Sequence, residues 1–93
     1  SITLTRWNEM NIYLIGEYVK RLTKEDITKF AYKQGITLKD KELNIIFNTI
    51  KENYKTLIYG NARSILDDLK NKVEPLTYNK IITLYREFKE KIS

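Results

Sequence analysis

Few types of side chain in this sequence are suited to catalysis or metal binding, and those present form no catalytic pattern. Histidine and cysteine are both absent, which removes the commonest general base, the commonest metal ligand and every thiol nucleophile. Asp67 and Asp68 are adjacent, so on a helix their carboxylates point about 100° apart and do not converge on one metal ion. Glu87 and Glu90 share a helix face, but neighbouring cations make them typical of a solvated charge belt. We therefore predict that the protein is not an enzyme and uses no cofactor and no metal ion.

Positive charge concentrates in one segment of the chain. The net charge is +5, and residues 20–41 hold seven cations against three anions. The cations of the whole chain are 13 lysines and only 4 arginines, a balance that codon bias and ordinary solubility also explain. When the acidic residues of the segment are paired with the lysine that follows them on the same helix, Lys33, Lys39 and Lys41 remain unpaired. Tyr32 beside them offers a ring for stacking on a base.

These four residues are a candidate nucleic-acid site, and we expect it to be weak. With one more cation from Lys20 or Arg21 they neutralise about four phosphates, so log affinity falls with log salt at a slope of roughly −3 to −4. No arginine lies between positions 22 and 54, so no side chain there can form the usual two-pronged contact with guanine. The expected binding is insensitive to sequence.

The apolar residues near the N-terminus form a second candidate site. From Arg6 to Arg21 the spacing predicts a helix whose apolar arc covers nearly half of its circumference, wider than a surface helix usually shows. Two interpretations are open. The helix is the centre of a bundle, or part of it contacts a protein partner or a second copy of the chain. For the second interpretation the candidate contact residues are Trp7, Met10 and Tyr13.

The rest of the chain also has helical spacing of its apolar residues, with no alternation typical of strands. Connections of two to seven residues leave no room for a linker. We therefore predict an all-α fold, a compact single domain over residues 1–93 with about five short helices. The predicted helices are Arg6–Arg21, Lys24–Gln34, Asp40 to about Tyr54, Ala62–Val73 and Tyr78–Ile92, with Asn61 as a cap and Lys55–Gly60 as a connector.

A repeated local pattern predicts where three of these helices begin. In each case an apolar residue precedes a cap position, and further apolar residues follow at helical spacing, as in a hydrophobic staple. The three sites are Leu22-Thr23, Leu38-Lys39 and Leu76-Thr77. At the first site, Asp26 is placed to complete a capping box. Gly35 is predicted to end the second helix in the left-handed conformation.

The helical spacing also predicts which side chains share one core. Residues on the apolar side of each helix are expected to be buried around one centre. They are Leu14, Ile27, Phe30, Leu43, Phe47, Ile50, Leu69, Ile81, Tyr85 and Phe88.

The order of features from Met10 to Ile92 resembles the YqfT-like family, small proteins of unknown function from Bacillus-type bacteria. The matching features are an N-terminal amphipathic helix, the run from Leu22 to Ile27, the stretch Tyr32–Ile36 leading into Leu38, the helix bearing Arg63 and the terminal helix with Thr77. The resemblance implies an all-helical bacterial protein and transfers no activity. Residues 1–9 fall outside it, and Met10 offers a second starting point with residues 1–9 as an upstream extension.

A second resemblance covers Leu22 to Tyr54, which is similar to the helix–loop–helix of SAP-type and Rho-N-terminal-type nucleic-acid-binding modules. Such modules present lysines around the start of their second helix, where Lys39 and Lys41 stand here. The sequence has no apolar run long enough to cross a membrane. We also expect no secretory leader, and hence a cytoplasmic protein. We predict a small protein-interaction or assembly factor, with an unknown protein partner or a homodimer. The alternative is a weak nucleic-acid-binding module around residues 20–41.

Overall fold

The computed structural model describes residues 14–92, and in this part of the chain every regular element is a helix. Residues 14–21 are helical, and the later helices are α2 (Lys24–Lys33), α3 (Asp40–Tyr59), α4 (Arg63–Lys70) and α5 (Pro75–Ile92). The all-α prediction is therefore confirmed. The predicted contact residues Trp7, Met10 and Tyr13 lie outside the described residues, and so does the proposed extension over residues 1–9.

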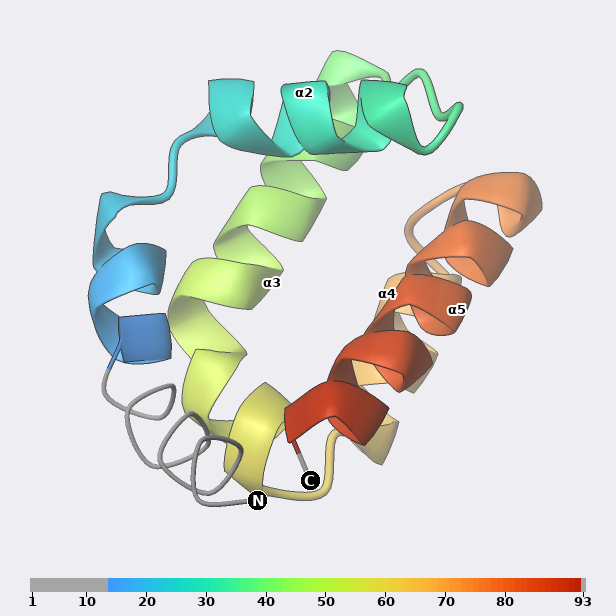
Figure 1. Cartoon of the computed structure of the whole chain (residues 1–93). Helices are drawn as coiled ribbons and strands as arrows, with labels where there is room; N and C mark the ends of the chain where they lie inside the picture. Colours follow the sequence, from blue (N-terminus) through green and yellow to red (C-terminus); the bar gives the residue numbers. More distant parts are fainter. Residues whose placement is uncertain (1–13, 93) are drawn as a thin grey trace.

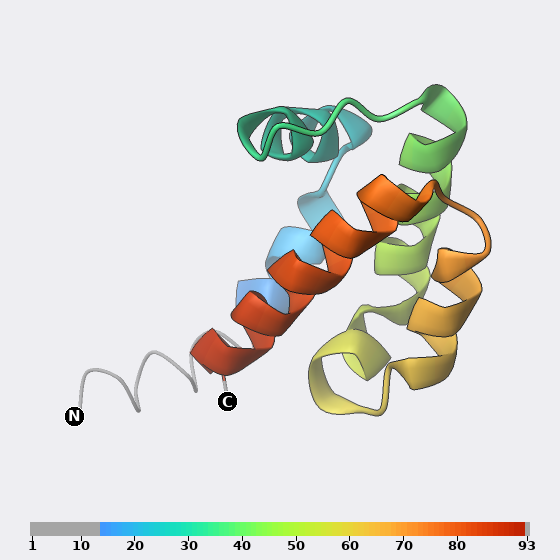
Figure 2. The same cartoon turned by 90° about the vertical axis from the view of Figure 1, so that its right-hand side faces the viewer.

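The longest helix, α3, occupies the middle of the molecule (Figure 1). The helix of residues 14–21 lies along one side of α3, and α2 crosses the N-terminal end of α3. Both views place α4 and α5 together on the other side of α3 (Figure 2). The interpretation of the first helix as the centre of the bundle is therefore wrong for residues 14–21, because the central position among the described residues belongs to α3.

The core is one cluster formed by residues of α2, α3, α4 and α5 and of the segments that join these helices. Its buried members are Leu22, Ile27, Ile46, Leu69 and Val73, and partly buried residues such as Leu43, Phe47, Ile50 and Ile81 pack against them. No large side chain among the described residues is completely buried. The helices therefore enclose a thin core, as expected for so short a chain.

Three residues that were predicted to be buried in the core are exposed, so the prediction is wrong for them. Leu14 is 46 % exposed, Phe30 is 53 % exposed and Phe88 is 37 % exposed. Phe30 stays outside because α2 contributes only Ile27 and Ala31 to the interior. Helical spacing placed these residues on broad apolar arcs, but each arc is covered by a neighbouring helix over only part of its width.

The start and end of α2 follow the prediction. The Thr23 hydroxyl accepts from the Asp26 backbone N–H at 3.1 Å, and the Asp26 carboxylate accepts from the Thr23 N–H at 3.0 Å. This reciprocal pair is the capping box. At the other end Gly35 has φ 76°, and the N–H of Ile36 donates to the carbonyl of Ala31 at 2.8 Å. The chain thus leaves α2 through a left-handed glycine, with the bonding of a Schellman motif.

Other boundaries differ from the prediction for local reasons. The prediction of a connector over Lys55–Gly60 is wrong, because α3 continues to Tyr59 and buries Ile58. α5 begins at Pro75 instead of Tyr78, since proline suits the first position of a helix. The third staple does not form, because Thr77 lies buried inside α5 and Leu76 is 78 % exposed.

The helix α4 is shorter than predicted and starts one residue later. It spans Arg63–Lys70, and the expected last turn to Val73 is a non-helical turn. Asn61 stands one position before the cap residue Ala62, yet its side-chain oxygen accepts from the Arg63 N–H at 3.0 Å. Asn61 therefore satisfies a first-turn donor, as a cap would.

Candidate functional site

The predicted nucleic-acid residues lie around the loop between α2 and α3. Tyr32 and Lys33 belong to the last turn of α2, Lys39 is the residue before α3, and Lys41 belongs to its first turn. All four side chains are exposed, and Tyr32 is 80 % exposed. Within the described part of the chain, Lys33 and Lys41 have no ion-pair partner.

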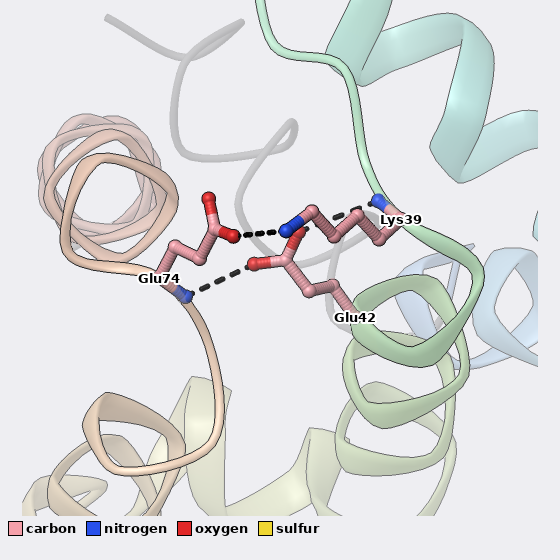
Figure 3. A network of polar contacts seen from close by, with 3 residues as sticks. All are labelled: Lys39, Glu42 and Glu74. Carbon is pink, nitrogen blue, oxygen red and sulfur yellow. Dashed lines mark hydrogen bonds and ion pairs between the residues drawn. The ribbon is translucent and has the colours of Figure 1, made fainter.

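Lys39 does not belong with these unpaired cations. Its Nζ forms an ion pair with the carboxylate of Glu74, which precedes α5 (Figure 3). The hydrogen bond and the charge of Glu74 raise the pKa of Lys39 above its ordinary value. The prediction of three unpaired lysines is wrong at this position, because sequence spacing cannot show a partner 35 residues away.

Beneath the Lys39–Glu74 pair lies a buried acid that the sequence analysis missed. The Glu42 side chain, in the first turn of α3, is buried. One carboxylate oxygen accepts from the Lys39 N–H at 3.3 Å, and the other accepts from the Glu74 N–H at 3.0 Å (Figure 3). A negative charge is favourable there, because both N–H groups belong to the starts of helices. Glu42 therefore joins the N-terminal ends of α3 and α5.

A lysine of α3, Lys51, donates hydrogen bonds to carbonyls at the C-terminal end of the first helix. The Nζ of Lys51 donates to the carbonyl of Val19 at 2.6 Å and to that of Lys20 at 2.9 Å. Both Lys51 and Lys24 also place their Nζ over the Phe47 ring, at 5.4 and 5.6 Å from its centroid. The carbonyls at a helix C-terminus carry partial negative charge, so a cation stabilises them.

Two lysines of α5 likewise donate hydrogen bonds to carbonyls at the ends of α2 and α3. Lys80 Nζ donates to the Gln34 carbonyl after α2 at 3.3 Å, and Lys89 Nζ donates to the Ile58 carbonyl near the end of α3 at 2.6 Å. These lysines are engaged in holding helix ends together. These lysines therefore have a role within the fold, so their positive charge does not have to indicate a polyanionic ligand.

A tyrosine of α5 completes the contact at the end of α3. The Tyr85 hydroxyl donates to the Leu57 carbonyl, and burial raises the pKa of Tyr85 above its ordinary value of 10.0. Because the folded-state pKa is the higher one, the unfolded chain loses this proton first. The stability that Tyr85 provides is therefore complete below about pH 10 and is lost as the pH rises further.

We expect Tyr85→Phe to lower the free energy of unfolding by about 1 kcal/mol at pH 7, through loss of this hydrogen bond. Above pH 10 the difference between the variant and the wild type should shrink. Urea unfolding at pH 7 and pH 10.5 measures both effects, with Tyr32→Phe as an exposed control. A difference that grows with pH would contradict the assignment.

The first helix has a covered side and an uncovered side. Val19 is buried, and a Cβ added to Gly16 would lie 3.8 Å from the Tyr54 hydroxyl of α3, so these residues mark the side packed on α3. Leu14 and Tyr18 stand two residues to either side of Gly16, about 200° around the helix. They are 46 % and 63 % exposed. The broad apolar arc of the sequence therefore divides into a packed face and an outer face.

We define the outer face of the first helix by Leu14, Tyr18 and Arg21. All three side chains are exposed, and Leu14 and Tyr18 give this face an apolar centre. Arg21 has no ion-pair partner within the described residues. A buried leucine or aromatic side chain contributes much of the energy of an interface, so this face is chemically suited to contact with another protein.

Metal-ligating side chains do not gather in the described residues. No group of three or more potential metal ligands lies together there. Asp68 is paired with Lys72 at 2.7 Å, and Ser64 lines a shallow polar groove between α3 and α4 with Thr49 and Asn53. No helix of the described part is of a length and apolarity that could cross a membrane.

Comparison with protein-family models, with curated proteins and with solved structures finds no match for this chain. The resemblance to the YqfT-like family therefore stays a prediction from the sequence.

Proposed function

We propose that the protein acts without catalysis, as a small interaction or assembly factor that docks a protein partner on the outer face of the first helix. The observation that carries the proposal is the exposure of Leu14 and Tyr18 on a helix whose opposite side is already packed on α3. A helix held in this way presents its side chains at little entropic cost, because it does not have to fold when it binds.

The environment of the protein is part of the same proposal. The chain contains no cysteine, which agrees with a reducing compartment. Together with the resemblance to a family of Bacillus-type bacteria, this supports the bacterial cytoplasm as the place where the partner is met.

Capture of partners by the immobilised protein, from nuclease-treated lysate of the organism that makes it, tests the proposed function. The variant Leu14→Glu with Tyr18→Glu should lose the captured protein, whereas Lys33→Glu with Lys41→Glu should retain it. Circular dichroism establishes that both variants are folded. Capture that vanishes with nuclease treatment, or that the outer-face variant retains, would contradict the proposal.

A second, weaker function is nucleic-acid binding around the α2–α3 loop, which the exposed ring of Tyr32 beside Lys33 favours. Because Lys39 is engaged by Glu74, Lys33 and Lys41 remain to neutralise about two phosphates. We then expect a salt slope of roughly −2 on duplex DNA and a dissociation constant of ~10⁻⁴ to 10⁻⁶ M.

Titration of labelled DNA and RNA at two salt concentrations tests this function. Lys33→Glu with Lys41→Glu should abolish the binding, and Lys55→Glu, on the exposed side of α3, is the matched control. Submicromolar binding that survives the higher salt concentration would make nucleic-acid binding the primary function.

A further inference from the structure

We propose that a hollow between α2 and α3 binds a small organic anion, a carboxylate with a short apolar chain. The hollow is lined by Lys24, Glu25, Thr28 and Lys29 of α2 and by Leu43 of α3. It includes no residue of the outer face of the first helix, so it is a second site beside the one proposed above.

The wall of the hollow is suited to an apolar chain. Its volume is about 270 Å³, and almost all of its surface is formed by apolar atoms. Leu43 contributes from α3, and Lys24 and Lys29 add the aliphatic stems of their side chains, as lysines do beside apolar surface. Sites for drug-sized ligands have about 300–1,000 Å³. The hollow therefore fits a smaller molecule, with a chain of a few carbon atoms.

The charges at the rim select an anionic group. Lys24 and Lys29 have no ion-pair partner within residues 14–92, although the spacing of Glu25 and Lys29 allows a pair. The Lys24 Nζ lies 5.6 Å from the centroid of the Phe47 ring, which places this cation beside α3. The Thr28 hydroxyl donates to the Lys24 carbonyl at 3.0 Å. The two ammonium groups are therefore the charged donors that the lining residues offer to a ligand.

The wider distribution of charge also favours an anion at this place. Residues 20–41 hold seven cations against three anions, and the α2 wall of the hollow belongs to this segment. Glu25, which is exposed, is the one negative charge among the lining residues. An exposed ion pair contributes little by itself, so the apolar contact and the two lysines must act together. We expect a dissociation constant on the order of 1 mM.

Titration of the ¹⁵N-labelled full chain with hexanoate, followed by amide ¹H–¹⁵N spectra, tests the site. Saturable shifts should be largest at the five lining residues. Three control ligands should bind more weakly: acetate lacks the chain, hexan-1-ol lacks the charge, and hexylammonium reverses the charge. Equal binding of hexanoate and hexan-1-ol, or shifts centred on Lys33 and Lys41 of the α2–α3 loop region, would overturn the proposal.

Substitutions of exposed residues test the charges, with effects of opposite sign. Lys24→Gln with Lys29→Gln should weaken hexanoate binding about fivefold, and Glu25→Gln should strengthen it about twofold. Lys33→Gln with Lys41→Gln is the matched control, because it removes the same charge from the same segment outside the lining of the hollow. Circular dichroism establishes that the variants are folded. If both double variants weakened binding equally, net charge alone would attract the anion and the hollow would not be its site.

Discussion

Replacing Leu69 with alanine should lower the free energy of unfolding by about 2–4 kcal/mol. Leu69 is the most buried apolar residue of the core cluster, and it lies on α4, where it is the only buried residue of that helix within the described chain. The deletion removes apolar contacts and leaves a cavity, because neighbouring helices relax only partly. A domain of this size has a total stability of roughly 5–14 kcal/mol, so the loss is a large fraction of it.

Urea unfolding followed by circular dichroism measures this effect. Leu76→Ala is a matched control, because the same atoms are removed from a side chain that is 78 % exposed. The control should change the free energy of unfolding by about 0.5 kcal/mol or less. Equal losses in the two variants would contradict the placement of the core.

Replacing Glu42 with alanine should cost about 1–3 kcal/mol, the next largest effect we expect. The substitution leaves the backbone N–H groups of Lys39 and Glu74 without their acceptor, and it breaks the link between the starts of α3 and α5. Lys39 keeps its exposed ion pair with Glu74, but surface pairs of this kind contribute little and are screened by salt.

Two comparison variants separate the role of Glu42 from loss of charge in general. Glu42→Gln retains one acceptor oxygen, so its stability should lie between that of the wild type and that of the alanine variant. Glu52→Ala removes an exposed carboxylate from the same helix and should change stability by less than about 0.5 kcal/mol. If Glu42→Ala were no more harmful than Glu52→Ala, the network would not stabilise the fold.

The sequence predicted those features that depend on neighbouring residues. The capping box of Thr23 and Asp26 and the left-handed Gly35 are set by a few adjacent side chains, and both are confirmed. The predicted start of α5 was wrong because two local signals competed. The fixed φ of Pro75 suits the first position of a helix, and this signal prevailed over the cap expected at Thr77. The all-α class followed from apolar periodicity alone.

The candidate site depends on contacts between distant residues, which helical spacing does not encode. Lys39 and Glu74 are 35 positions apart, and Lys51 contacts carbonyls more than 30 positions earlier. The one available signal was Glu42 three residues after Lys39, the spacing of a capping box. The exposure of Leu14 was also missed, because periodicity shows that a face is apolar and does not show which neighbour covers it.

The central claim is that the outer face of the first helix is the face through which this protein associates. Amide ¹H–¹⁵N spectra of the labelled protein, recorded with and without the protein captured from lysate, test it most directly. The account predicts shifts at Leu14, Tyr18 and Arg21 when that protein is added, and none at Tyr32 and Lys33. Shifts centred on the α2–α3 loop or on α5, or no shifts at any residue, would contradict it.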